Sequence, residues 1–238
     1  MSTERHSIRY GRQTIAFTVE RRARRTLEIA VEPDATVAVA APHGASMEAI
    51  AEKVGKHAAW VQRQQRFFSQ YQPPTPERRF IAGETHLYLG RQHRLKVVRH
   101  VQAGVKLTRG FIVVQSREPQ RTERTRQLVE DWYRIRAQAK LAERLEASLT
   151  RFPEPDSFRP RGLIVRRMRQ RWGSLSPSLR LLLNRRLIEA PVDAIDYVIT
   201  HELCHIAEPH HGPGFFALLD RILPDWPRRK ERLERRMA

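Results

Sequence analysis

The chain has 238 residues, of which 40% are hydrophobic, and a formal net charge of +18 at pH 7. A chain of this length can bury a core without a stabilising disulfide or metal, and its single cysteine excludes an intramolecular disulfide. The positive charge keeps nucleic acid open as a partner, although the excess of arginine is spread over both halves of the sequence.

Nothing in the sequence predicts a membrane protein. No segment reaches about 18 consecutive apolar residues, the minimum for a transmembrane helix. Residues 1–17 contain no long apolar run, so we expect no secretory signal peptide. A single cysteine suits a reducing compartment, and we therefore expect a cytoplasmic protein with no membrane partner.

The N-terminal half has the pattern of a β-rich region. Its predicted strands are 14–20, 26–32, 35–42 and four short segments between residues 85 and 115, the last four as an antiparallel meander. An arginine-rich turn, 21–25, joins the first two strands. A helix with an apolar stripe is predicted at 46–71, and a proline-rich linker follows it at 72–79.

The C-terminal half is richer in helices. A long helix is predicted at 119–150, and Pro153 and Pro155 end it. The remaining predicted elements are strands at 161–168 and 180–187, joined by the turn RWGSLSPS, and helices that begin at Pro191, residue 215 and residue 226, the last of them solvated. These elements predict an α+β fold, with a mostly antiparallel β region that contains one helix at 1–118 and a second domain at 119–238.

The segment HELCH at 201–205 carries the clearest chemical signal. Its two histidines, His201 and His205, are four residues apart on the predicted helix, so both rings lie on one side and can reach a single Zn²⁺. Glu202 lies about 100° around the helix from His201, where a general base can flank the metal without binding it. The opposite side of the helix is apolar, which predicts that it packs against a core.

A catalytic zinc site with an open position needs a third protein ligand. His211 is the sixth residue after His205, and Pro209 ends the helix before it, so the chain can turn back toward the metal. We predict that His211, and not the neighbouring His210, is the third ligand. A carboxylate from the following helix, such as Asp220, is the alternative.

Three segments resemble the YgjP-like metallopeptidase domain, which is related to the SprT-like and WLM zinc proteases. They are RQRWGSLS (169–176), LLLN (181–184) and DYVITHELCHIAEPHHGPGFF (196–216). The resemblance implies a zincin-like metallopeptidase unit at 119–238. It also implies that Zn²⁺ is bound by His201, His205 and His211, and that Glu202 is the catalytic base.

Several residues are candidates for the surroundings of the metal. Tyr197 lies one turn before the first ligand and could donate to a ligand or to an oxyanion. Arg171 could orient a carboxylate or a carbonyl, and Asn184 could contact a neighbouring backbone. Two positions depart from the family: Leu175 replaces the usual Cys of the WGSC turn, and His210 stands where Asn is common, beside the third ligand.

We therefore expect a zinc-dependent metallopeptidase that acts on a peptide or protein substrate. Zinc would activate a water, Glu202 would take its proton and pass it to the leaving amine, and the strand at 180–187 could pair with an extended substrate. Two other functions stay open. The protein could be associated with nucleic acid, with a structural or vestigial zinc or as a protease of DNA-bound proteins, or it could hydrolyse a non-peptide bond.

Overall fold

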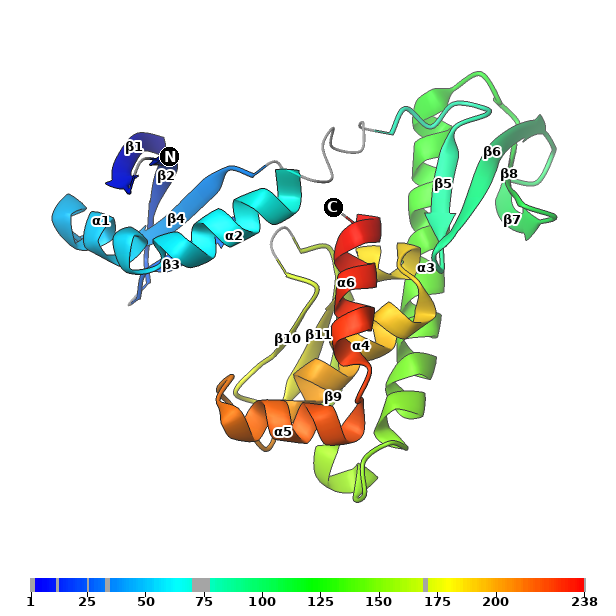
Figure 1. The fold of residues 1–238 in the computed structure, drawn as a ribbon. Helices are drawn as coiled ribbons and strands as arrows, with labels where there is room; N and C mark the ends of the chain where they lie inside the picture. The colour runs from blue at the N-terminus through cyan, green and yellow to red at the C-terminus, as the bar shows by residue number, and fades with distance from the viewer. Residues whose placement is uncertain are drawn as a thin grey trace. The chain divides into compact units, whose positions relative to one another are not determined.

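The computed structural model describes residues 3–11, 13–24, 26–32, 35–69, 78–168 and 171–237. The chain forms two compact units, residues 1–76 and 77–237 (Figure 1). Both contain helices and small sheets, which confirms the predicted α+β class. Most of the linker predicted at 72–79 lies outside the described residues. No helix in the described ranges is long and apolar enough to span a membrane.

The first unit is a four-stranded sheet with two helices. Its elements are β1 (Thr3–Tyr10), β2 (Gln13–Arg22), β3 (Glu28–Val31), β4 (Val37–Pro42), α1 (Met47–Lys56) and α2 (Ala58–Ser69). The strand order is β1-β2-β4-β3, in which β2 and β4 are parallel and the two outer pairs are antiparallel. The first two predicted strands, β2 and β3, are therefore not partners, because β4 lies between them.

Helices α1 and α2 cover one face of this sheet. Their side chains Ile50, Val54 and Val61 are completely buried in the core of the first unit. The sequence predicted one helix at 46–71, but the chain forms two helices that meet at His57, where the backbone leaves helical geometry. This break lets both helices lay an apolar side on the same sheet.

The second unit begins with another four-stranded sheet. It contains β5 (Thr85–Tyr88), β6 (Arg91–Arg99), β7 (Gly104–Thr108) and β8 (Phe111–Ser116). Its order is β5-β6-β8-β7 with β6 and β8 parallel, so the predicted antiparallel meander is wrong. Ile112 and Val114 pack against the long helix α3 (Thr122–Leu149). We expected a domain boundary at residue 118; the compact units divide at residue 76 instead, because this sheet and α3 share one hydrophobic core.

A three-stranded sheet and three further α-helices complete the described part of the second unit (Figure 1). The strands are β9 (Gly162–Arg166), β10 (Gly173–Leu175) and β11 (Arg180–Asn184), the helices are α4 (Val192–Cys204), α5 (Pro213–Ile222) and α6 (Trp226–Met237), and short 3-10 helices lie at Pro155–Phe158 and Arg185–Glu189. Strand β11 lies between β10 and β9, antiparallel to β10 and parallel to β9. The two strands predicted here, β9 and β11, are thus parallel neighbours, and the segment predicted as their turn contains β10.

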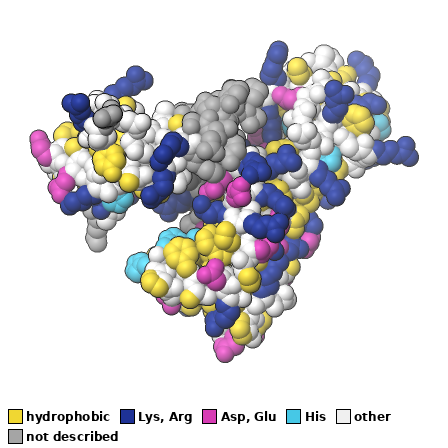
Figure 2. Space-filling model, in the orientation of Figure 1, with side chains coloured by type: hydrophobic (Ala, Val, Ile, Leu, Met, Phe, Trp, Pro, Cys, Tyr) yellow, Lys and Arg dark blue, Asp and Glu magenta, His cyan; other side chains and the backbone are white. Residues whose placement is uncertain are grey.

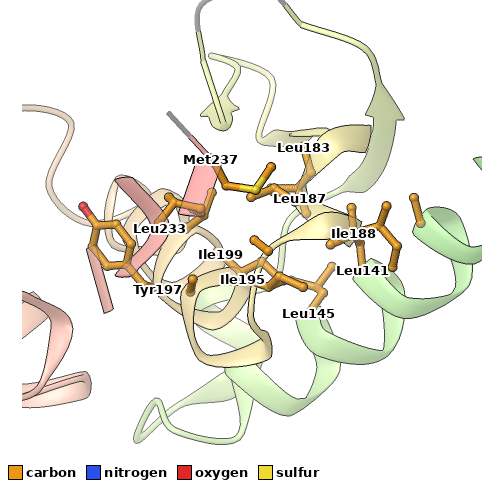
Figure 3. Packing of buried hydrophobic residues seen from close by; sticks show 14 of the residues in the cluster. Leu141, Leu145, Leu183, Leu187, Ile188, Ile195, Tyr197, Ile199, Leu233 and Met237 are labelled. Carbon is orange, nitrogen blue, oxygen red and sulfur yellow. The ribbon is translucent and has the colours of Figure 1, made fainter. Parts of the chain in front are cut away.

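Helix α4 is packed on several sides (Figure 3). Its residues Ile195, Ile199 and Leu203 are completely buried, and the helix packs against both α3 and α6. Helix α6 was predicted from its charge to be solvated. Most of its residues are exposed or half-buried, but Leu233 and Met237 are buried on the side that faces the core (Figure 3).

Ion pairs hold α4 to the end of α3. Asp196 is 3% exposed, and its carboxylate accepts hydrogen bonds from Nε and Nη2 of Arg144, both at 2.8 Å. Nη2 of Arg151 donates to the same carboxylate at 2.8 Å. A buried carboxylate needs such partners to offset the loss of its hydration, so these contacts fix how α4 is seated on α3.

Candidate metal centre

Local sequence determines how α4 begins and ends. Pro191 precedes its first turn, and Asp193 in that turn supplies the negative charge that suits a helix N-terminus. The helix ends at Cys204 with His205 as its C-cap, and one more turn is closed by a hydrogen bond from the Glu208 N–H to the Cys204 carbonyl. The chain then reverses and begins α5, as the proline after Glu208 predicted.

The reversal brings three histidines together. The donor nitrogens of His201, His205 and His211 all lie within 4.8 Å of one another. Nε2 of His201 and Nε2 of His211 are 3.0 Å apart, close to the roughly 3.3 Å between two nitrogens bound tetrahedrally at about 2.0–2.1 Å from one zinc ion. Among the described residues, His210 and Asp220 do not belong to this group, and a tryptophan indole donates to the carboxylate of Asp220.

The surroundings of His201 and His211 favour the neutral imidazole, which is the form that binds a metal. Burial, with His211 and His205 as further causes, lowers the pKa of His201 to about 3. The pKa of His211 is also lowered, by partial burial and by His205. Nδ1 of His205 lies 3.0 Å from the carbonyl oxygen of Glu208. Because a carbonyl only accepts, this Nδ1 carries the proton and Nε2 keeps a free lone pair.

Phe215, near the start of α5, packs against all three rings. It is completely buried, and its ring centroid lies 4.9, 4.6 and 4.7 Å from those of His201, His205 and His211. Such packing restricts rotation of the imidazoles and lowers the polarity around them. Nδ1 of His201 is buried and has no hydrogen-bond partner among the residues that the structure describes.

The carboxyl of Glu202 faces β10. It is 8% exposed, and burial raises its pKa to about 7, whereas the N–H of Leu175 and the charge of Arg171 act to lower it. Gly173 lies so close that a Cβ at this position would be 2.8 Å from Cγ of Glu202. Strand β10 therefore orients the carboxyl with a backbone donor and leaves room for it with a glycine.

The remaining candidates have varied surroundings. Tyr197 is 8% exposed, and its ring centroid lies 5.8 Å from that of the first histidine of the group. Asn184 is buried, and its Nδ2 donates to the backbone carbonyl of Arg171 at 2.9 Å, so it fixes the segment that carries the exposed Arg171 side chain. Burial raises the pKa of the Cys204 thiol to about 12, which disfavours a thiolate ligand.

Sequence reasoning missed the residues that shape the centre around its donors. Phe215, Gly173 and the backbone N–H of Leu175 had no assigned role, because each acts on a group far away in the sequence. One signal for Gly173 was present: a glycine within a strand often marks the close approach of another group. Because the sequence predicts a turn for this segment and not a strand, the signal does not apply there.

The donor set fits a zinc ion. Three neutral imidazoles can bind zinc and leave a position for water or substrate. A buried carboxyl with a pKa of about 7 can accept and release a proton at neutral pH. Such a combination is suited to metal-assisted hydrolysis.

Comparison with known proteins identifies one family. The model of the YgjP-like family, described as a metallopeptidase domain, matches residues 25–236. The matched range contains β10, α4 and all three clustered histidines. The comparisons found no match among curated proteins or among solved structures.

Proposed function

This chain belongs to the YgjP-like metallopeptidase domain family, and we propose that it is a zinc-dependent peptidase with Glu202 as its general base. The observation that carries the proposal is the group of three histidine nitrogens within 4.8 Å of one another, from the end of α4 and the segment before α5. The buried carboxyl of Glu202 belongs to the residue that follows the first of these histidines. Membership of the family supports metallopeptidase chemistry, and the surroundings of the three histidines support the individual roles.

Three histidines, His201, His205 and His211, would hold the zinc ion. When bound, zinc supplies Lewis-acid activation of water and of the scissile carbonyl. Glu202 takes a proton from the attacking water and delivers it to the amine of the leaving group. The N–H of Leu175 orients this carboxyl during both transfers.

A peptide substrate would lie along β10. We expected the strand at 180–187 to pair with the substrate, but β11 has β10 on one side and β9 on the other, so its backbone groups are already used. Strand β10 is at the edge of the sheet and touches Glu202 through Gly173. An extended peptide that adds to this edge would pass the catalytic carboxyl.

Four side chains would assist without binding the metal. Tyr197 could donate to the developing oxyanion, and Arg171 could orient a carbonyl or a carboxylate of the substrate. Asn184 would position the segment of Arg171, and His210 would lie beside the third ligand. Leu175 stands where the family commonly has Cys, but the catalytic carboxyl is contacted by its backbone N–H, which any residue except proline supplies.

A nucleic-acid-associated protein is the second candidate. The net charge of +18 favours it. In that case the zinc would be structural or vestigial, or the peptidase would act on proteins bound to DNA. Hydrolysis of a non-peptide bond would use the same centre, because the motif specifies activation of water and not the substrate.

Zinc analysis and digestion of a peptide library test the proposal. Wild type and Glu202→Gln should both bind about one zinc per chain, and Glu202→Gln should hydrolyse peptides roughly 10²–10⁴-fold more slowly. His201→Ala is the matched variant that should lose the metal. Loss of zinc from Glu202→Gln would show that Glu202 is a metal ligand. Undiminished hydrolysis by this variant would exclude Glu202 as the general base. Failure of the wild type to take up zinc would remove the site.

A further inference from the structure

The sheet β5-β6-β8-β7 has one packed face and one face open to solvent. Side chains alternate between the faces, and on the packed face Leu95, Ile112 and Val114 are buried in the core shared with α3. The other face, which we call the open face, carries Arg94, Lys96, Lys106, Thr108, Phe111 and Gln115. All six of these side chains are exposed or half-buried.

The charge of this sheet has one sign. From residue 85 to residue 116 the basic residues are Arg91, Arg94, Lys96, Arg99, Lys106 and Arg109, and there is no aspartate or glutamate. Arg94, Lys96 and Lys106 have no ion-pair partner among the residues that the structure describes. Lys and Arg side chains project from this part of the molecule, at the upper right of Figure 2. The open face is therefore a concentrated positive surface.

An exposed aromatic ring lies among these charges. Phe111 is 40% exposed, and the parallel pairing of β6 with β8 places it beside Arg94. In the next row of the sheet, Val113 lies between Lys96 on β6 and Lys106 on β7. Since neighbouring strands are about 4.8 Å apart, the backbones of the two lysines are separated by roughly 10 Å.

We propose that the open face binds single-stranded RNA. An unpaired base can stack on the ring of Phe111, while the basic side chains on the neighbouring strands neutralise phosphates. The side chains of Thr108 and Gln115 can donate and accept, and neither has a hydrogen-bond partner in the described part of the chain. Such groups can bind the ribose 2′-hydroxyl, which distinguishes RNA from DNA. A duplex would hide its bases from Phe111, and an acidic peptide would have no base to stack on it.

This surface is separate from the proposed hydrolytic centre. The open face belongs to β6, β7 and β8, whereas the three histidines belong to α4 and to the segment before α5. Glu202→Gln should therefore bind RNA like the wild type while losing hydrolysis. Failure of either proposal leaves the other intact.

Fluorescence anisotropy tests the proposal. The full chain is titrated into a labelled, unstructured RNA of about 20 nucleotides, which is longer than the site of a single binding module. The logarithm of the binding constant should fall linearly with the logarithm of the salt concentration. The double variant Lys96→Gln/Lys106→Gln should reduce this slope by about 1.4, because each lost phosphate contact removes about 0.7. Phe111→Leu should weaken binding by roughly 5- to 100-fold at every salt concentration without changing the slope.

Matched variants distinguish RNA binding at the open face from binding that depends only on the overall positive charge of the protein. Lys53→Gln/Lys56→Gln removes the same charge from α1, Tyr10→Ala removes another exposed ring, and Phe111→Tyr keeps a stacking ring; all three should bind like the wild type. Circular dichroism verifies that each variant is folded.

Three results would overturn the proposed surface: no binding in about 50 mM salt, an equal loss of slope in the α1 control, or wild-type affinity of Phe111→Leu. Unlabelled RNA, duplex RNA, DNA of the same sequence and polyglutamate are each tested as competitors that displace the labelled RNA from the protein. Competition by any of the other three as effective as that of unlabelled RNA would overturn the assignment to single-stranded RNA.

Discussion

The buried carboxyl of Glu202 should make the metal-free protein less stable as the pH rises. Its pKa is about 7 in the folded protein, above its ordinary value of 4.5. Between these two pKa values the folded protein binds more protons than the unfolded chain. The contribution of Glu202 to the free energy of unfolding is therefore complete below pH 4.5 and is lost as the pH rises through about 7. At about 1.4 kcal/mol for each pH unit, the interval from 4.5 to about 7 corresponds to about 3.5 kcal/mol of unfolding free energy.

The variant Glu202→Gln isolates this effect, because it removes the titrating group and keeps the shape of the side chain. His201 changes the wild-type curve in the opposite direction: its pKa of about 3 is below the ordinary 6.5, so its contribution is complete above 6.5 and is lost as the pH falls. Comparing the two proteins cancels that contribution. Urea unfolding with a chelator should show that the wild type loses roughly 2.5 kcal/mol more than the variant between about pH 5 and about pH 8.

Added zinc provides the second half of this test. A divalent cation near the carboxyl favours its charged form, so saturating zinc should reduce the difference between wild type and Glu202→Gln. If the unfolding free energies of the two metal-free proteins changed with pH in parallel, burial would not raise the pKa of Glu202. A difference that grows when zinc is added would refute a metal beside Glu202.

Four other substitutions test the histidine centre and the helix that carries it. His211→Ala should lower zinc affinity by more than about 100-fold, and His210→Ala should bind zinc like the wild type; the reverse order in a zinc titration would exclude His211 as a ligand. Gly173→Ala should keep zinc but lose hydrolysis, since its Cβ would lie 2.8 Å from Cγ of Glu202; unchanged peptide cleavage would contradict this. Asp196→Asn should lower the unfolding free energy by about 3 kcal/mol, and an unchanged urea midpoint would show that its ion pairs contribute little.

The helices and the clustered histidines could be predicted because their signals are local. The spacing of His201 and His205 places both rings on one side of a helix, and the structure brings His211 to them as the break at Pro209 predicted. The long apolar pattern of α3 was also found, because a helix repeats its pattern over many residues. Which of these groups binds a metal stays a prediction from their chemistry.

Strand order could not be predicted in the same way, because a two-residue period does not reveal which strand lies beside another. Strand β10 has only three residues, too few for any period, and was predicted to be part of a turn. Strand β1 was missed because Arg5, His6 and Arg9 obscure its alternation, and as an edge strand it contributes little to the core. The contact of β10 with Glu202 could not be predicted either, because it depends on the strand order of the three-stranded sheet.

The two four-stranded sheets share one strand order, although no repeat is visible in the sequence. Each places a parallel pair in the centre and an antiparallel partner on each side. Their solvent-facing sides differ in chemistry. In the first sheet, Glu20 pairs with Arg22 and Glu28 pairs with Arg24, so acidic and basic groups compensate one another. The second sheet has no carboxylate between residues 85 and 116 and exposes Phe111. A shared fold does not confer a shared partner, and these side chains are the reason to expect RNA on the second sheet alone.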